Sequence, residues 1–206
     1  MLYVPEFFAE RDEATLHAFI EAHSFAMLIS PDPTDPPVTH LPLLLDRSQG
    51  ERGVLLGHVA RGNPHWRHMQ AQPEVVAVFH GPHAYISPSC YESHPSVPTW
   101  NYATVHVHGV ARLLHDPQDL ERLVRRLVDH YEGGRPQPWH MQLPADYQTQ
   151  MLGGIVGFEI TIARFTGKFK LSQNRSAADR VRVAEALERT DAGDRAVAAL
   201  MRSRQP

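Results

Sequence analysis

Cysteine is almost absent from this chain of 206 residues, and long hydrophobic runs are missing altogether. Cys90 is the one cysteine, so an internal disulfide is impossible and a thiolate zinc cluster would need a second chain. No apolar stretch approaches the roughly 18 residues that span a bilayer. The acidic opening segment, MLYVPEFFAERDE, lacks the profile of a signal peptide. We therefore expect a cytoplasmic protein without a membrane segment.

An excess of basic charge is also missing. The formal net charge is −3, which differs from the basic footprint of domains that grip nucleic-acid phosphates. The sequence contains no HExxH, Walker loop, GxGxxG or serine elbow, so hydrolysis and nucleotide-triphosphate turnover are disfavoured as functions. With 42% hydrophobic residues, the composition is that of one globular domain with small appendages.

Hydrophobic alternation predicts around six strands. They are expected at 25–30, 38–46, 53–63, 74–81 continuing into 83–88, about 99–115, and 154–165. Pro42 lacks the N–H that a strand ladder needs, which indicates a sheet edge or a bulge. A loop is expected at 89–98. Few helices separate these strands, so the pattern favours an antiparallel barrel over a doubly wound parallel sheet.

Helical periodicity is confined to segments between and after the strands. Helices are expected at 12–23, 64–70, 116–132, about 144–152, 176–189 and 192–203. The clearest begins at Asp116, which can cap it, with Pro117 in the first turn. We therefore expect a mainly β (α+β) barrel domain with peripheral helices at 1–175, followed by a C-terminal helical tail at 176–206.

The stretch VPTWNYATVHVHG, residues 97–109, joins aromatic side chains to a strictly alternating strand. Neighbouring strand residues point to opposite faces. One face carries Trp100, Tyr102, Thr104, His106 and His108. The other, mostly small and apolar and therefore suited to a barrel interior, carries Asn101, Ala103, Val105, Val107 and Gly109. Two interpretations of the outer aromatics stay open: they pack beneath peripheral helices, or they form a subunit interface that can hold a flat cofactor.

Histidine is abundant, with 14 copies. His106 and His108 lie two apart on a strand, and His65 and His68 lie three apart on a predicted helix. Neither pair brings the third and fourth ligands that a metal site needs, because sequence spacing supplies none. We therefore predict no metal site.

Two polar segments are candidate anion sites. GHVARGNPHW, 57–66, places Arg61 and Asn63 where a strand turns into a short helix, whose exposed N–H groups favour anions. GKFKLSQNR, 167–175, follows a strand and offers basic and amide side chains. The alternative for each segment is a solvated connection.

The chain contains, in this order, YVPEFF, HLPLLLD, GHVARGNPHW, VFHGPHAYISPS, VPTWNYATVHVHG, IVGFEI and KLSQNR. In order and approximate spacing these motifs resemble the PaiB family of FMN-binding negative transcriptional regulators. The resemblance covers residues 1 to about 180. It implies an antiparallel split β-barrel of the FMN-binding type, related to flavin reductases and pyridoxamine phosphate oxidases. It also implies a homodimer with FMN at the subunit interface.

The same resemblance implies a set of cofactor-binding residues. On the phosphate and ribityl side it places His40, His58, Arg61 and Asn63. Around the flavin ring it places Tyr85, Ser87, Trp100, Asn101 and Tyr102. Closing the pocket, from the same chain or its partner, it places Lys170, Ser172, Gln173 and Asn174. Family members tend to read SPSWY before a longer loop to VPTWNY, whereas this sequence reads SPSCY, with Cys90, and has a shorter loop.

Three functions are compared. The resemblance favours a dimeric regulator that binds FMN or a similar flat cofactor, with no catalytic residue assigned. The alternative is a flavin-dependent oxidoreductase that uses reduced nicotinamide, or a haem-binding split barrel, because the chain is rich in histidine. Direct DNA binding is disfavoured, since the tail interleaves its arginines with acidic residues and the net charge is negative.

Overall fold

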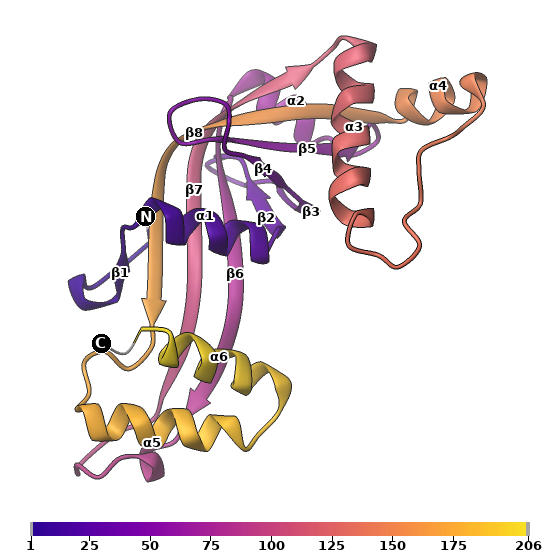
Figure 1. Cartoon of the computed structure of the whole chain (residues 1–206). Coiled ribbons are helices and arrows are strands. Elements are labelled where there is room, and N and C mark those ends of the chain that lie inside the picture. The colour runs from indigo at the N-terminus through magenta and orange to yellow at the C-terminus, as the bar shows by residue number, and fades with distance from the viewer. Residues whose placement is uncertain (1, 205–206) are drawn as a thin grey trace. The chain divides into compact units, whose positions relative to one another are not determined.

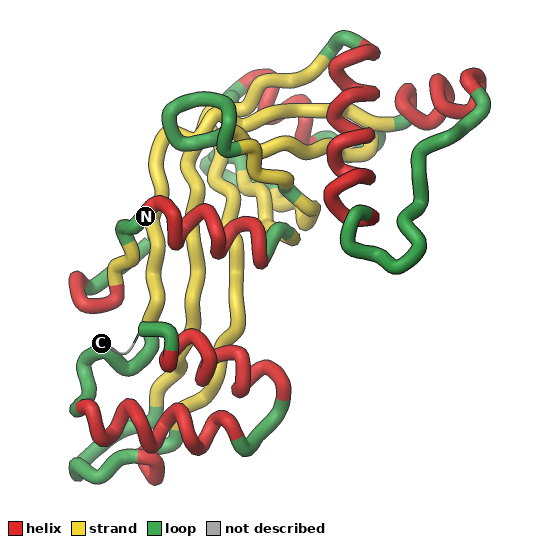
Figure 2. The backbone as a smooth tube through the Cα atoms, in the orientation of Figure 1, coloured by secondary structure: helices red, strands yellow, loops and turns green. Residues whose placement is uncertain are grey.

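A computed structural model describes residues 2–204, which form six α-helices, two short 3-10 helices and one mostly antiparallel sheet (Figures 1 and 2). The strands are β1 Ala9–Glu10, β2 Phe25–Ile29, β3 Val38–Pro42, β4 Leu44–Asp46, β5 Val54–Ala60, β6 Glu74–Ile86, β7 Thr99–Leu114 and β8 Ile155–Lys170. The α-helices are α1 Glu13–Ala22, α2 His65–Ala71, α3 Pro117–Glu132, α4 Ala145–Gly153, α5 Ala177–Glu188 and α6 Ala192–Arg202, and the 3-10 helices are η1 Glu6–Phe8 and η2 Pro88–Cys90. The predicted fold class, mainly β with peripheral helices, is confirmed. None of the helices within residues 2–204 is both long enough and apolar enough to cross a bilayer.

The described chain divides into two compact units. The first unit comprises residues 2–19, 80–106 and 166–204, and the second comprises 20–79 and 107–165. Strands β6, β7 and β8 contribute residues to both units. The predicted division at residue 175 stays a prediction.

The two end strands of the sheet are neighbours in sequence. The strand order is β3-β2-β6-β7-β8-β5-β4, yet β3 ends at Pro42 and β4 begins at Leu44. Leu43 alone joins opposite ends of the sheet, so the part of the sheet in the second unit curls back on itself. The predicted strand at 38–46 is therefore two strands. Pro42 lies in an edge strand, as its missing N–H predicts.

One apolar stripe of α3 covers the curled sheet of the second unit. Asp116 caps this helix as predicted, because its carboxylate accepts a hydrogen bond of 2.7 Å from the backbone N–H of Gln118. The buried cluster consists of Leu44, Val54, Leu56, Leu120, Leu123 and Leu127. Gly157 of β8 permits the close approach of α3, since a Cβ at that position would lie 2.7 Å from Leu120 Cδ1.

In the first unit, helices cover one face of β7 and β8. α5 and α6 lie side by side (Figures 1 and 2), and the apolar residues that they bury are Val183, Ala184, Leu187, Val197, Ala198 and Met201. Phe169 of β8 packs against Phe19 of α1, with ring centroids 5.0 Å apart. Ala103 and Val105 of β7 are fully buried, which confirms the predicted inward face of that strand.

The last strand is longer than predicted. β8 continues to Lys170 instead of ending near residue 165, so the first part of GKFKLSQNR is strand and not a loop after one. Gly167 and Phe169 face the helices, whereas Lys168 and Lys170 point the opposite way, because strand residues alternate. Because Lys168 and Lys170 are charged, hydrophobic alternation did not identify this part of the strand. Similarly, the segments predicted at 74–81 and 83–88 form one strand, β6.

Candidate functional site

Side chains of β6, β7 and β8 in the first unit form a surface opposite the helices, here called the outer face. The outer face comprises His83, Tyr85, Trp100, Tyr102, Lys168 and Lys170. Tyr85 is 51% exposed and Trp100 is 52% exposed. Large open rings that gather on a folded domain mark ligand or interaction surfaces. The alternation of burial along β7 confirms that Trp100 and Tyr102 share the outward side.

Aromatic rings meet across neighbouring strands of the outer face. The ring centroids of Tyr85 and Trp100 are 5.8 Å apart, with planes inclined by 72°. The imidazole of His83 adds a third ring, 6.1 Å from Trp100 and inclined by 42°. Rings that are fixed by strands and open on one side can hold a planar ligand by stacking.

An ammonium group lies directly beside Trp100. Lys170 Nζ donates to the backbone carbonyl of Trp100 and to Thr99 Oγ1, both at 2.5 Å. Burial lowers the pKa of Lys170, and the positive charges of Lys168 and Arg175 lower it further. The outer face therefore combines stacking surface with positive charge.

Three other predicted cofactor residues serve the inner side of β7 and the turn after β8. Asn101 is fully buried, and its amide donates to Ser172 Oγ at 2.9 Å. Ser172 has a φ of 64°, in the left-handed region, where the chain leaves β8. The side chain of Gln173 accepts from the N–H of Leu171 at 2.6 Å and donates to the carbonyl of Phe169 at 2.5 Å. These contacts hold the end of β8 in place.

Ser87 and Asn174 lie where strands of the first unit end. Ser87 Oγ accepts a hydrogen bond of 3.2 Å from the N–H of Ser89 and so caps η2. Asn174 is exposed in the turn that follows β8. A role of either residue in cofactor binding stays a prediction.

In the second unit, His40, His58 and Asn63 line one pocket of about 320 Å³. Burial lowers the pKa of His58, and its Nδ1 has no hydrogen-bond partner within the described residues. The amide of Asn63 donates to Thr39 Oγ1 at 3.0 Å and accepts from the N–H of His65 at 3.0 Å. Three of the four residues predicted for the phosphate side thus surround a single pocket.

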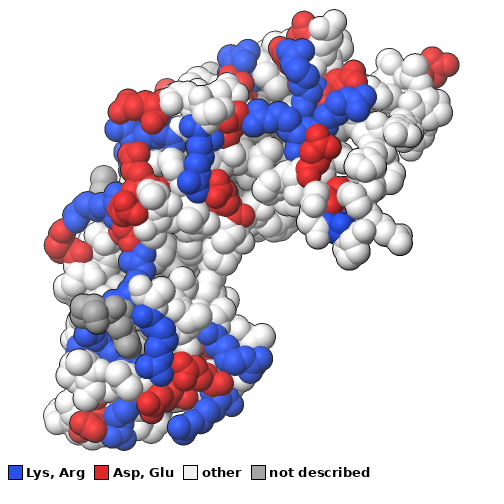
Figure 3. Space-filling view, viewed as in Figure 1, with Lys and Arg blue, Asp and Glu red and all other residues white. Residues whose placement is uncertain are grey.

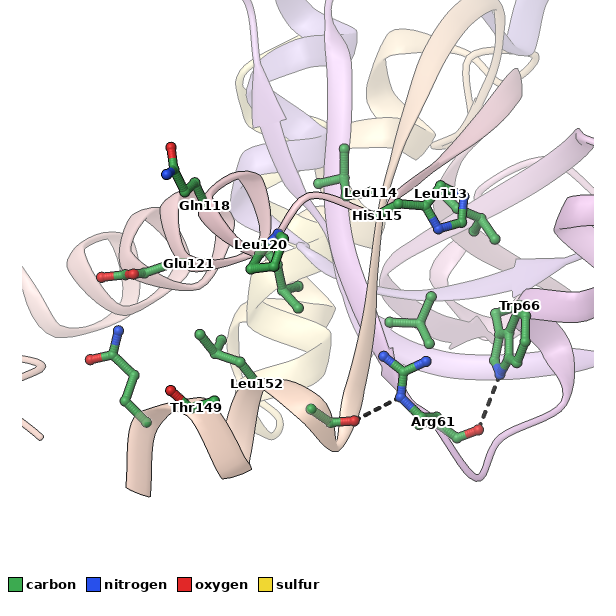
Figure 4. Close-up of a pocket in the computed structure, with 14 residues that line it drawn as sticks. Arg61, Trp66, Leu113, Leu114, His115, Gln118, Leu120, Glu121, Thr149 and Leu152 are labelled. Carbon is green, nitrogen blue, oxygen red and sulfur yellow. Dashed lines mark hydrogen bonds between the residues drawn. The ribbon is translucent and has the colours of Figure 1, made fainter. Parts of the chain in front are cut away.

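Arg61, the fourth, lines a different cavity of about 480 Å³ (Figure 4). Its Nε donates to the carbonyl of Gly153 at 2.7 Å, and its Nη2 donates to that of Ile155 at 2.9 Å. Its own carbonyl accepts a hydrogen bond of 3.1 Å from the indole of Trp66. The two carbonyls belong to the end of α4 and the start of β8, so the guanidinium caps that junction.

The imidazole of His65 is buried behind Asn63. Its Nε2 lies 3.0 Å from Ser30 Oγ, and its Nδ1 lies 2.8 Å from Thr39 Oγ1. Burial, and in addition the charge of His68, lowers the pKa of His65 to about 4. The ring is therefore neutral at pH 7 and both of its nitrogens are engaged internally. Residues 2–204 contain no group of three or more side chains that could hold a metal ion.

We expect the free energy of unfolding to fall as pH drops from about 6.5 to about 4. The pKa of an unfolded histidine is about 6.5, whereas that of folded His65 is about 4. The unfolded state therefore takes up the proton first, and stability that is complete above pH 6.5 is lost across this interval. Urea unfolding at several pH values measures the loss.

The control for this prediction is His140→Gln, which changes a histidine in an exposed segment. His65→Gln should show a weaker pH dependence than the wild type, whereas His140→Gln should retain it. An unchanged pH dependence in His65→Gln would contradict the assignment.

The arrangement of strands places this protein among the split barrels. It shares its fold with the flavocytochrome Anf3 from Azotobacter vinelandii, at a TM-score of 0.60 and 16% identity over 87% of this chain and 78% of that one. The FAD and Heme binding protein from Mycobacterium smegmatis matches at a TM-score of 0.61 and 11% identity, over 84% and 78% of the two chains. At such identities the likeness defines the fold alone.

Sequence relatives define the family. The family model described as "Putative FMN-binding domain" matches residues 2–164. The Protease synthase and sporulation protein PAI 2 from Bacillus subtilis is 36% identical over 189 residues, which cover 91% of this chain and 89% of that protein. The chain therefore belongs to the PaiB family, as its seven motifs predicted.

The sequence did not single out every residue of this surface. Lys168 and His83 escaped notice, although each lies two positions before a residue that was named, Lys170 and Tyr85. Period-two spacing was the signal that could have found them, because it places such pairs on one side of a strand.

Proposed function

We propose that this protein binds FMN, or a similar flat cofactor, on the outer face, at an interface between two copies of the chain, and that it acts as a regulator. The observation that carries the proposal is the pair of open rings, Tyr85 and Trp100, on the side of the sheet opposite the helices of the first unit. Membership of a family described by FMN binding supports the choice of a flavin.

The residues of the outer face suit both the ring and the phosphate group of FMN. Tyr85 and Trp100 offer stacking surface to an isoalloxazine ring, and Lys170 offers a cation to its phosphate. The pocket of His40, His58 and Asn63 in the second unit is a separate candidate site for a polar ligand, because it has polar walls and a histidine nitrogen without a partner in the described chain.

When bound, the flavin would supply hydride or electron transfer. The residues of this chain would bind and orient it and set the charge around it. Tyr85 and Trp100 would fix the plane of the ring, and Lys170 would stabilise negative charge. No residue is assigned a proton-transfer role, which favours regulation by ligand occupancy over turnover.

The homodimer is proposed on the same surface. Removal of exposed aromatic area from water favours association, and amphipathic aromatics are enriched in such interfaces. Sedimentation analysis with and without FMN measures the oligomeric state. A protein that binds FMN but stays monomeric at micromolar concentration would contradict the proposed dimer interface, whereas the proposed flavin binding would stand.

Trp100→Ala is expected to weaken FMN binding about tenfold. Loss of one stacking partner is equivalent to about 1.4 kcal/mol. Quenching of flavin fluorescence during titration measures the dissociation constant. Trp139→Ala, which removes a similarly exposed indole (48%) outside the outer face, should leave it unchanged. The proposal fails if the wild type does not quench FMN at micromolar concentrations, or if the two variants behave alike.

A haem-binding or oxidoreductase role is the second candidate. Burial lowers the pKa of His106, so this imidazole is neutral at pH 7 and able to ligate iron. A Soret band that forms on addition of haem and is lost in His106→Ala would favour haem. Anaerobic bleaching of bound flavin by NADPH would favour the oxidoreductase.

A regulatory role would act through a protein partner and not through DNA. In α5 and α6, Arg202 pairs with Glu188 at 3.0 Å, and Arg182 pairs with Glu92 at 2.7 Å. Figure 3 shows basic and acidic side chains interleaved over these helices. Such a mixed surface is typical of a solvated face. The proposal retains the predicted helical tail that starts at residue 176, whose last two residues lie outside the described chain, and a cytoplasmic location.

A further inference from the structure

Lysine occurs only twice in the 206 residues, as Lys168 and Lys170, while the chain uses arginine for its remaining positive charges. Both lysines lie near the end of β8, the orange strand in Figure 1. A spacing of two residues places them on one side of the strand, within the outer face. Both lysines of the chain therefore lie together on the outer face.

The ammonium groups of Lys168 and Lys170 are partly shielded from solvent. Lys168 is 8% exposed, and its Nζ donates to the carbonyl of Tyr3 at 2.9 Å. The same Nζ lies 5.4 Å from the ring centroids of both Tyr3 and Tyr102. Lys170 is half-buried, and its Nζ lies 5.8 Å from the ring centroid of Phe8.

Neutral groups are the partners of both cations. Lys168 contacts a carbonyl and two rings, and Lys170 contacts a carbonyl, a hydroxyl and one ring. Within residues 2–204, neither ammonium forms an ion pair with a carboxylate. Two desolvated like charges on one strand repel each other, and an anion would relieve both the repulsion and the desolvation cost. The low pKa of Lys170, caused by burial and by its charged neighbours, agrees with this imbalance.

We propose that Lys168 and Lys170 form an anion subsite for a phosphate monoester, with Lys170 in direct contact and Lys168 supplying the second charge. The identity of the ligand as FMN rests on the proposed function, whereas the subsite itself rests on the two lysines. The 2.5 Å contact from Lys170 Nζ to the backbone carbonyl of Trp100 places this charge beside the strand that carries the stacking ring.

This subsite differs from the turn to which the family resemblance assigns the phosphate. Nε and Nη2 of Arg61 already donate to backbone carbonyls. The amide of Asn63 is likewise engaged with Thr39 and His65. The ammonium groups of the lysines have more to gain from an anion, because neither has an ionic partner among residues 2–204.

The first experiment compares FMN with riboflavin, which lacks the phosphate. Lys170→Gln should weaken FMN binding about tenfold, the effect of one charge-assisted hydrogen bond, and leave riboflavin binding unchanged. Lys170→Arg should restore most of the affinity for FMN. Arg189→Gln, which removes an exposed cation at the end of α5, should affect neither ligand. An FMN-to-riboflavin ratio that is the same in Lys170→Gln and in the wild type would overturn the proposal.

The second experiment needs no flavin binding. Because the chain holds two lysines, an amine-reactive acetylating reagent followed by mass spectrometry reports on this subsite alone, apart from the terminal amine. Millimolar inorganic phosphate or pyrophosphate should slow the acetylation of Lys170 severalfold in the full chain. A chloride salt at equal ionic strength, without sulfate, should leave the acetylation rate unchanged.

The two experiments separate the possible failures. If neither flavin binds but phosphate protects Lys170, the flavin proposal fails and the anion subsite stands for a different phosphate ligand. If riboflavin and FMN bind equally well and phosphate gives no protection, the subsite is wrong and the flavin proposal stands. Protection by FMN but not by riboflavin or free phosphate identifies the flavin phosphate as the anion.

Discussion

Phe158→Ala is expected to lower the free energy of unfolding by about 4 kcal/mol, the usual cost of emptying a phenylalanine site in a core. Phe158 has no exposed surface and lies on β8 opposite Gly57 of β5. A Cβ at Gly57 would be 3.1 Å from Phe158 Cζ, so the ring fills the space that the glycine leaves open. Its removal would leave a cavity that the strand pair cannot close. Urea unfolding, or a fall in Tm of roughly 10 °C, measures the effect.

The matched control is Thr161→Ala on the same strand. Thr161 is exposed, so this change should cost less than about 1 kcal/mol. Equal losses in both variants would show that β8 contributes through its backbone alone and that the ring is not part of a packed core.

Gly109→Ala is expected to cost about 3 kcal/mol by the opposite mechanism, which is overpacking. A Cβ at Gly109 would lie 2.5 Å from Ile160 Cγ2 and 2.5 Å from the backbone carbonyl oxygen of Thr161. The isoleucine side chain can rotate, but the carbonyl belongs to the neighbouring strand. The methyl group can therefore be accommodated only if β7 and β8 move apart.

Gly62→Ala tests whether loss of a glycine matters in itself. Nothing lies within 4 Å of a Cβ at that position, and the change should alter stability by no more than about 0.5 kcal/mol. A Gly109→Ala protein with the unfolding midpoint of the Gly62→Ala protein would refute the close approach of the two strands.

Local patterns predicted the elements that one segment determines. Alternation from Trp100 to Gly109 gave both faces of β7, and the leucine stripe after Asp116 gave the buried side of α3. In each case one apolar face of the element packs against one surface, so the hydrophobic period of the sequence predicts which side chains are buried. The long motifs added the family and its split barrel.

Patterns failed where distant segments decide the structure. The change from β3 to β4 at Leu43 depends on two different partner strands, β2 and β5, and no local period encodes a partner. The outward side of β8 at Lys168 holds charges that hydrophobic alternation does not recognise. For the candidate site, the sequence grouped Arg61 with Asn63 because they lie two positions apart at one turn, whereas their side chains line different pockets.

The single-residue link at Leu43 has a consequence for the chain while it is being synthesised. β4 and β5 leave the ribosome early, but β5 completes its pairing with β8, matching Val54 to Thr161. Until that late segment emerges, β5 presents an unsatisfied edge, the kind of exposed strand that recruits chaperones or self-associates. Of the described strands, β8 is the last in sequence, and the sheet is complete only when β8 lies between β7 and β5.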